Sequence, residues 1–317
     1  MKIIPLDQIR QRLEGLDLLA AIEAAFVAYS EGRSIVPPVG ELLLPAGEVH
    51  IKYGCITGDE HYVIKIASGF YGNPALGLPS SNGLMLLFRQ ATGEPVALLQ
   101  DEGFLTDTRT AVAGAVAAKH LAPKEVRRIG IVGTGIQARL QLEQLRPITT
   151  CRQVLAWGRG EAQLADYRRQ GEALGFAVET TQDTSEVLSA CQLVVTTTPA
   201  TEPLLFAEHL QPGTHITAVG SDTPHKQELD WQILQRADLV VADSRAQCLE
   251  RGEIHRALSV GAILEEKMVE LGEVIRGASS GRTSEEQITV ADLTGVAVQD
   301  IAIASAVYGA AGSDDLP

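Results

Sequence analysis

The amino-acid sequence predicts an α/β protein with two domains, a doubly wound parallel sheet and a smaller α+β domain. Between residues 127 and about 245, short apolar runs alternate with helical stretches, a pattern typical of a parallel sheet covered by helices on both faces. Between residues 40 and 100, short apolar runs are instead separated by Gly, Pro and acidic breaks, which indicates a small antiparallel or mixed sheet. The length of 317 residues is sufficient for two domains.

In the first half, helical spacing of apolar residues predicts one or two helices over 6–31. Residues 91–94 are predicted to turn a hairpin within the small sheet. An Ala-rich stretch at 104–122 predicts a long buried helix. Pro123 and Lys124 then link this helix to the second half.

In the second half, 246–276 is predicted to be helical, and 287–311 to begin as a strand and end as a helix. We place the boundaries so that 1–123 and 300–317 form the smaller domain and 124–299 the larger one. The predicted strands of the larger domain are "RIGIVG", "QVLAWG", "AVETT", "QLVVTTT", "HITAVG" and "DLVVAD".

The composition narrows the possible functions. There are 40 acidic and 26 basic residues, a net charge of −14, which argues against a general nucleic-acid or membrane-surface binder because both partners need a basic face. The four cysteines form no CxxC pair, so no metal site is expected. Neither a secretory signal nor an apolar run near the ~20 residues of a membrane span is apparent. We therefore expect a cytoplasmic protein.

A Gly-rich turn follows the first strand of the larger domain. The first Gly of a G-x-G-x-x-A pattern allows the tight turn, the second admits a pyrophosphate, and the small last residue permits close helix packing. The turn therefore predicts a Rossmann-type site for NAD(P)H, with a purely structural strand-to-helix turn as the alternative. Its residues are Gly133, Thr134, Gly135, Ile136, Gln137 and Ala138.

The end of the second strand indicates which dinucleotide binds. An acidic residue there would select NAD, but the chain has Gly158 and Arg159. An Arg can bind a 2′-phosphate, which modestly favours NADP. The alternative is that Arg159 simply faces solvent.

Further cofactor contacts are predicted at the carboxyl ends of the later strands, where ligands bind in doubly wound sheets. Thr hydroxyls there could reach the ribose or the nicotinamide, although β-branched residues also satisfy strand propensity. The predicted residues are Thr196, Thr197, Thr198, Val219, Gly220, Ser221 and Gly295.

Four charged residues are candidates for substrate chemistry. Lys52, Lys65 and Arg109 stand in apolar or small-residue stretches of the first half, where a buried Lys needs a partner and an Arg suits a carboxylate. Asp222 follows the fifth strand, where it could orient an amine or pass a proton. The alternatives are ion pairs or surface positions for the cations, and a turn residue or helix cap for Asp222.

Four motifs together resemble the ornithine cyclodeaminase/mu-crystallin family. They are "FLTDTRTAVAGAVAAKHLAP", "IGIVGTGIQARLQLEQL", "HITAVGSDTPHKQELD" and "GVAVQD". The resemblance covers nearly the whole chain and implies a homodimer that binds NAD(P) and transfers hydride at the α-carbon of an amino or imino acid. It implies that Lys65 and Arg109 bind the substrate carboxylate, with Lys65 also active in proton transfer, and that Asp222 holds the amine. It places Ser80, Ser81 and Asn82 in the pocket.

The chain departs from the cyclodeaminase pattern at three places. Val39 stands where cyclodeaminases have Arg, Lys52 where they have Glu, and 292–295 reads Asp-Leu-Thr-Gly in place of a Lys-Ser segment. A Lys would repel the second ammonium group of a diamine but suits a second carboxylate. We therefore expect a reductase of a small imino acid, with an imino dicarboxylate such as iminosuccinate as a candidate substrate. The rivals are an ammonia-releasing cyclodeaminase and a non-catalytic, crystallin-like NADPH-binding protein.

Overall fold

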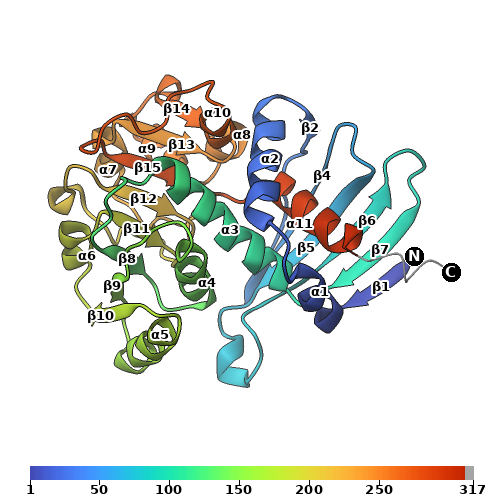
Figure 1. Ribbon diagram of the computed structural model, residues 1–317, viewed down its shortest axis with the longest axis horizontal. Coiled ribbons are helices and arrows are strands. Elements are labelled where there is room, and N and C mark those ends of the chain that lie inside the picture. The colour runs from blue at the N-terminus through green and yellow to red at the C-terminus, as the bar shows by residue number, and fades with distance from the viewer. Residues whose placement is uncertain (311–317) are drawn as a thin grey trace. The chain divides into compact units, whose positions relative to one another are not determined.

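A computed structural model describes residues 1–310, and the chain divides into two units (Figure 1). The first unit comprises Met1–Arg109 and the segment from Val296 onward, and the second comprises Thr110–Gly295. The first boundary lies inside helix α3 (Phe104–Leu121), whereas the sequence-based boundary follows that helix, because a continuous helix contains no break that the sequence could signal. The end of the segment 300–317, which the sequence assigns to the smaller domain, lies outside the described residues from 311 onward.

The first unit is built on a mixed sheet with the strand order β1-β7-β6-β5-β4-β2, in which β3 also pairs with β4. β1 runs parallel to β7, and the other pairs are antiparallel. The predicted hairpin is confirmed, since β6 and β7 pair across residues 90–94. The strands are β1 (Lys2–Pro5), β2 (Ser34–Ile35), β3 (Gly40–Leu44), β4 (Gly47–Ile56), β5 (His61–Gly69), β6 (Ser81–Arg89) and β7 (Pro95–Gln100).

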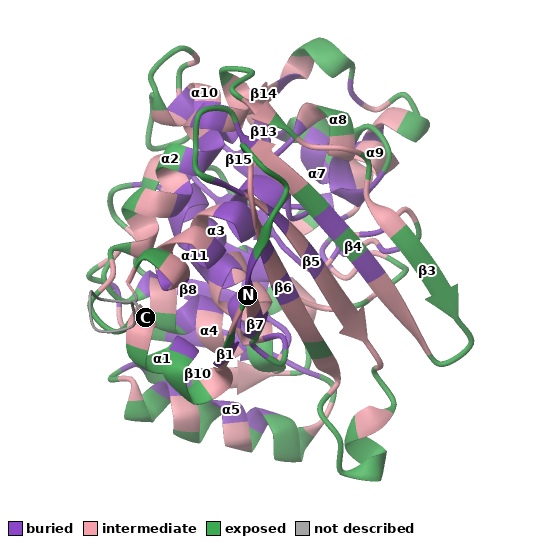
Figure 2. Ribbon diagram, turned by 90° about the vertical axis from the view of Figure 1, so that its right-hand side faces the viewer, coloured by how far each residue is buried: buried purple, intermediate pink, exposed green. Residues whose placement is uncertain are grey.

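Helices cover one face of this sheet, and α11 packs on β4, β5 and α2. Burial alternates with a period of two along β4 and β5, as expected for strands with one covered face, and Figure 2 shows the alternation along β4. An Asp17 side chain caps the start of α2 by accepting the N–H of Ala20 at 3.0 Å. The helices of this unit are α1 (Leu6–Leu13), α2 (Leu18–Ser30), the 3-10 helix η1 (Asn73–Leu76) and α11 (Ala297–Gly309).

The second unit contains an eight-stranded, fully parallel sheet with the order β10-β9-β8-β11-β12-β15-β13-β14. The predicted doubly wound fold is therefore confirmed, and all six predicted strands are present. The strands are β8 (Ile129–Val132), β9 (Gln153–Trp157), β10 (Ala177–Thr181), β11 (Leu193–Thr196), β12 (His215–Ala218), β13 (Leu239–Ala242), β14 (Met268–Glu270) and β15 (Thr289–Asp292).

The helices of the second unit connect these strands, as parallel pairing requires. They are α4 (Ile136–Leu145), α5 (Glu161–Ala173), α6 (Thr184–Ala190), η2 (Ala207–His209), α7 (Trp231–Arg236), α8 (Arg245–Cys248), α9 (Gly252–Ser259), η3 (Glu265–Lys267) and α10 (Leu271–Ile275). None of the helices in the described part of the chain is both long and apolar enough to span a membrane.

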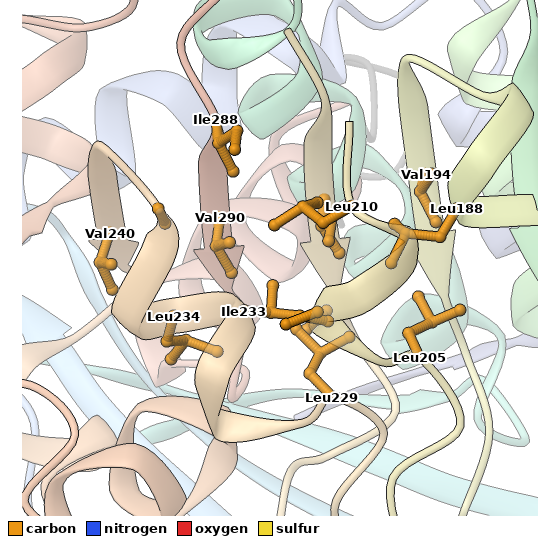
Figure 3. Packing of buried hydrophobic residues seen from close by; sticks show 14 of the residues in the cluster. Leu188, Val194, Leu205, Leu210, Leu229, Ile233, Leu234, Val240, Ile288 and Val290 are labelled. Carbon is orange, nitrogen blue, oxygen red and sulfur yellow. The ribbon is translucent and has the colours of Figure 1, made fainter. Parts of the chain in front are cut away.

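The core of the second unit explains why its strands are continuous apolar runs. Central strands such as β11, β12 and β15 are buried along their whole length, so both faces require apolar side chains. Figure 3 shows part of this core, including Val194 of β11, Val290 of β15 and Ile233 of α7. The burial of this layer holds the carboxyl ends of the strands in register at one edge.

Candidate functional site

Two of the predicted substrate-binding cations, Lys65 and Arg109, contact one buried carboxylate, Asp300, in the first unit. Lys65 Nζ lies 3.1 Å from both carboxylate oxygens of Asp300. Arg109 Nε lies 2.9 Å from Asp300 Oδ1, and Arg109 Nη1 donates to Gln299 Oε1 at 2.8 Å. The side chains of Lys65, Arg109 and Asp300 are 2%, 5% and 1% exposed. Strand β5, helix α3 and helix α11 thus each contribute one charge to a water-excluded cluster.

Lys52 belongs to the same cluster. It is directly opposite Lys65 in the β4–β5 register, so both side chains project from the same, helix-covered face of the sheet. Lys52 is buried, and its charge acts on both Lys65 and Asp300. The structure therefore brings together the three cations that the sequence singled out in the first half.

Burial and the neighbouring charges shift the pKa of Lys65 and the pKa of Asp300 differently. Burial lowers the pKa of Lys65 to about 7, Arg109 and Lys52 lower it too, and Asp300 opposes them. Burial alone would raise the pKa of Asp300, but Arg109, Lys65 and Lys52 outweigh it and hold the pKa below its ordinary value. Near neutrality, Lys65 is therefore present in both protonation states, while Asp300 stays ionised.

The predicted pocket residues Ser80, Ser81 and Asn82 lie at and before the start of β6, in the same unit. Ser81 pairs with Gly69, four residues from Lys65 on β5, and therefore shares the Lys65 face of the sheet. Asn82 lies on the opposite face and is exposed, and its side chain accepts the N–H of the following residue at 2.7 Å. Ser80, which precedes the strand, is half-buried.

The Gly-rich turn between β8 and α4, in the second unit, has the shape that a pyrophosphate requires. Gly133 has φ +122°, and a Cβ there would lie 2.5 Å from Thr197 Oγ1. A Cβ on Gly135 would meet no atom within 4 Å, so the backbone is open to a ligand at this point. Ala138 is fully buried, as close helix packing demands.

The first turn of α4 completes this part of the site. Its N-cap, Gly135, provides no side-chain hydrogen bond, so the first N–H groups of the helix are not capped by a side chain and face the region that the second Gly leaves open. The predicted residues Ile136 and Gln137 occupy this turn, and Ile136 is 50% exposed. These residues fit a dinucleotide phosphate.

Replacing Gly135 with Ala is expected to weaken dinucleotide binding about tenfold or more while leaving the melting temperature within about a degree. Gly135 has φ −77°, which Ala adopts freely, but the added methyl group fills the space left open at the turn. Fluorescence titration with NADH and thermal unfolding check the two halves of this expectation. Unchanged binding would show that the turn does not hold a phosphate.

At the end of β9, Gly158 packs against the Gly-rich turn and Arg159 is exposed. A Cβ on Gly158 would lie 2.8 Å from Thr134 Cγ2, so the two loops are in contact. The Arg159 side chain forms no ion pair with another described residue, and its carbonyl accepts from Gln182 Nε2 at 2.9 Å. An exposed cation without an ion-pair partner among the described residues therefore follows directly on the glycine that packs against the Gly-rich turn.

The predicted residues at the ends of β11 and β12 are held by internal hydrogen bonds. Thr196 Oγ1 donates to Glu228 at 2.7 Å, and Thr197 Oγ1 donates to the carbonyl of Val132 at 3.1 Å. The N–H groups of Thr198 and Gly220 donate to Glu228 at 2.6 and 2.9 Å. The Glu228 carboxylate thus joins the ends of two neighbouring strands.

The loop after β12 carries Asp222, whose side chain is one-third exposed. Its Oδ1 accepts from Lys226 Nζ at 2.8 Å, and Ser221 Oγ donates to the carbonyl of Lys226 at 2.9 Å. The helix-cap alternative for Asp222 is not seen, because the next helix, α7, is capped by Asp230. Asp222 is therefore held in a loop at the carboxyl edge of the sheet.

The remaining predicted cofactor residues lie at the same edge. Val219 donates its N–H to the carbonyl of Thr196 at 3.0 Å. Gly295 has φ +82°, and its N–H donates to Asp243 at 2.6 Å. No group of three His, Cys, Asp or Glu side chains within residues 1–310 is arranged to bind a metal ion.

A sequence model of the ornithine cyclodeaminase/mu-crystallin family matches residues 4–315. The chain belongs to this family. The family assignment made from the four motifs is therefore confirmed, and it covers both units.

Curated relatives of the family include proteins described as cyclodeaminases and as dehydrogenases. An uncharacterised cyclodeaminase of Sinorhizobium fredii is 44% identical over 314 residues, 97% of this chain and 95% of the relative. The alanine dehydrogenase of Archaeoglobus fulgidus is 37% identical over 307 residues, 96% of this chain and 94% of the relative.

Solved structures of the family are similar over nearly their whole length. An archaeal alanine dehydrogenase dimer with bound NAD has TM-score 0.91 and 35% identity, covering 100% of this chain and 97% of that one. The Thermococcus litoralis Δ1-pyrroline-2-carboxylate reductase, with NADH and L-proline, has TM-score 0.92 and 27% identity, covering 98% and 97%. The Paracoccus denitrificans iminosuccinate reductase with NAD⁺ has TM-score 0.88 and 30% identity, covering 98% and 96%.

Two buried acids that the sequence predictions did not include organise these sites. Asp300 lies in the family motif "GVAVQD", and the signal available was a Gln-Asp pair inside an otherwise apolar helix. Glu228 lies in "HKQELD", in a polar segment that offers no pattern to mark one of its charged residues as buried.

Proposed function

We propose that this chain is an NAD(P)H-dependent reductase of a small imino acid, or the matching amino acid dehydrogenase in reverse. The observation that carries the proposal is the buried contact of Lys65 and Arg109 with Asp300, in a chain whose other unit has a turn shaped for a dinucleotide. Buried cations in pairs suit a carboxylate. The characterised relatives act on amino or imino acids and were solved with NAD or NADH.

In this proposal, Arg109 and Lys65 bind and orient the α-carboxylate of the substrate. Lys65 has a pKa of about 7, so it can also give or take a proton near neutrality. Asp222 orients the substrate nitrogen or passes a proton to it. The turn at Gly133 and Gly135 would hold the pyrophosphate of a nicotinamide dinucleotide, which would supply the hydride.

The substrate class that we favour is an imino dicarboxylate. Lys52 brings a third buried cation to the Lys65–Arg109 cluster, which suits a second carboxylate and disfavours the second ammonium group of a diamine. One relative is an iminosuccinate reductase, and iminosuccinate has the two carboxylates that this cluster would recognise.

One experiment distinguishes the candidate functions. NADH and NADPH oxidation is followed with oxaloacetate plus ammonia, with other keto acids plus ammonia or methylamine, and with cyclic imines. In parallel, ornithine is tested for ammonia release. Oxidation with an imino acid supports the reductase; ammonia from ornithine without net cofactor turnover would identify a cyclodeaminase; dinucleotide binding with no turnover would identify a crystallin-like binder.

We further propose a preference for NADP over NAD, which rests on Arg159. Arg159 is exposed and follows Gly158, which packs against the Gly-rich turn. It stands at the strand end where an acidic residue would bind the ribose of NAD. Arg159→Ala is expected to raise the Kd of NADPH about tenfold and to leave the Kd of NADH unchanged, because one cation–phosphate contact is lost. Equal effects on both dinucleotides would contradict this assignment.

We also propose that the chain forms a homodimer through the uncovered face of the first sheet. Apolar side chains gather on this face of β3 and β4, where Leu42 and Leu44 are 55% and 41% exposed, and Ile51 and Tyr53 are 38% and 39% exposed. An exposed apolar face of this kind is typical of an interface between chains. A related alanine dehydrogenase is a dimer, so a second copy of this chain is the expected partner.

Ile51→Glu is expected to weaken self-association about tenfold or more, because the interface would bury an unpaired charge. Sedimentation velocity at several concentrations measures the change. The matched control is Leu264→Glu, a similar substitution at a 71% exposed side chain of the second unit, and it should leave the association constant unchanged. A wild-type chain that remains monomeric would contradict the proposal directly.

A further inference from the structure

Glu228 is a buried acid that the proposed chemistry does not use. It lies in the loop between β12 and α7 and is fully buried. Its carboxylate accepts three hydrogen bonds, from Thr196 Oγ1, the N–H of Thr198 and the N–H of Gly220. Two of these donors follow or end β11 and the third follows β12, so one side chain ties together two strand ends.

The fit around this carboxylate is tight. A Cβ on Gly220 would lie 2.2 Å from the carbonyl oxygen of Thr198 and 2.6 Å from Glu228 Oε2, so the two loops approach as closely as a glycine permits. Two of the donors bond Oε2 and the third bonds Oε1, so both terminal atoms must be acceptors. An ionised carboxylate meets this requirement, whereas an amide replaces one oxygen with an NH2 donor. The separation of the two loops therefore depends on an ionised acid at position 228.

The backbone of Glu228 is itself fixed by a second buried acid. Glu253, in the first turn of α9, accepts the N–H of Glu228 at 2.7 Å and the N–H of Leu229 at 3.2 Å. Asp292, at the end of β15, accepts the N–H of Ile254 at 2.8 Å. These hydrogen bonds fix the backbone of Glu228 and therefore hold its carboxylate at the ends of β11 and β12.

We propose that Glu228 is a positioning residue for the dinucleotide site: its ionised carboxylate holds the ends of β11 and β12 in the arrangement that binds the nicotinamide half of the cofactor. This inference rests on the proposed function, because it presumes that a dinucleotide binds at this edge of the sheet. Glu228 is not a catalytic residue, since its oxygens are occupied by the protein's own donors. It acts through the backbone of Thr198 and Gly220.

The surroundings of Glu228 are expected to make dinucleotide binding depend on pH. Burial raises its pKa to about 7, although the hydrogen bonds from Thr198, Thr196 and Gly220 oppose the shift. The titratable groups nearest to it are the buried acids Glu253 and Asp292, whose own pKa values are raised by burial and by the charge of Glu228, while Lys226 in the same loop pairs with Asp222. Below neutrality Glu228 takes up a proton and loses acceptor capacity, so cofactor binding is expected to weaken as the pH falls through about 7.

The test compares Glu228→Gln with a control that removes a buried hydrogen bond elsewhere in β12. Thr217→Val removes the contact between Thr217 Oγ1 and His215 Nε2, 2.9 Å apart, and does not touch either loop. Kd values for NADH and NADPH are measured by fluorescence titration on both sides of neutrality, with thermal unfolding alongside. Glu228→Gln is expected to raise Kd about tenfold in mildly alkaline buffer and to abolish its pH dependence, whereas Thr217→Val keeps the wild-type Kd and pH dependence.

Several outcomes would overturn this inference. If Glu228→Gln lowers the melting temperature but binds the dinucleotide with wild-type Kd, the carboxylate has only a structural role. If Glu228→Gln does not fold, Thr196→Val removes one of the three bonds, and it must raise Kd about twofold to threefold for the proposal to stand. If the wild-type chain binds neither dinucleotide, the proposed function fails first.

Discussion

Replacing Arg109 with Lys is expected to lower kcat/KM for the imino acid about a hundredfold and to leave the Kd of the dinucleotide unchanged. Arg109 pairs through Nε with Asp300 and donates from Nη1 to Gln299. These two contacts fix the plane of the guanidinium and the direction of its remaining N–H donors. Lys preserves the charge but presents no fork, and the bonds of one charged fork are worth about 3 kcal/mol. Most of the loss should appear in substrate binding and orientation.

Stability alone does not account for this expectation. Arg109→Lys keeps a cation beside Asp300, so it avoids the larger cost of leaving a buried carboxylate without a partner. Arg282→Lys is the matched control, because Arg282 also donates to several buried acceptors, including the carbonyl of Leu121 at 2.7 Å, but lies in the second unit. It should lower the melting temperature and leave kcat/KM unchanged. Wild-type efficiency in Arg109→Lys would refute the carboxylate-binding role.

Local signals were sufficient to predict the parts of the fold that form from neighbouring residues. The turn at Gly133 was predictable because a strand, a glycine pattern and a helix follow one another without interruption. The hairpin between β6 and β7 was predictable for the same reason. Lys65 could be singled out because an apolar strand with one Lys predicts a buried charge that needs a partner.

Strands that form only by pairing with a strand far away in the sequence could not be predicted. Strand β1 has only the residues Lys2–Pro5, and it exists because β7 accepts it as a parallel edge strand. Strand β14 (Met268–Glu270) interrupts the segment 246–276, which the sequence predicted as helical and which is therefore only partly so. Its three residues are too short to produce a period, and β13 stabilises it.

The carboxylate that pairs with Lys65 and Arg109 could not be predicted, for a similar reason. Asp300 is 235 positions from Lys65 in the chain, and only the packing of α11 on β4 and β5 brings the two together. A polar pair in an Ala-rich helix indicates a buried contact but does not identify the residues it meets. The sequence could therefore nominate Lys65 and Arg109 without revealing what balances them.

Replacing Asp300 with Asn is expected to shift the pH dependence of substrate binding toward acid and to destabilise the fold. Asp300 is the group that raises the pKa of Lys65 against burial, Arg109 and Lys52. Without its charge the pKa of Lys65 falls below the present value of about 7. Because only the ammonium form of Lys65 binds a carboxylate, KM for the imino acid rises as the pH passes above that pKa, and in the variant this rise begins at lower pH.

The accompanying loss of stability has a defined sign and size. Removing one partner of a buried ion pair costs about 3–5 kcal/mol, and Lys65 recovers part of this by releasing its proton at neutral pH. The pKa of Lys65 in the folded variant then lies further below its pKa in the unfolded chain. The free energy of unfolding therefore decreases as the pH falls from the unfolded-state pKa toward the folded-state pKa. KM against pH and denaturant unfolding at two pH values measure both effects. Asp292→Asn removes a buried carboxylate from the second unit instead, and an equal shift of the KM profile in that variant would show that Asp300 does not set the charge of Lys65.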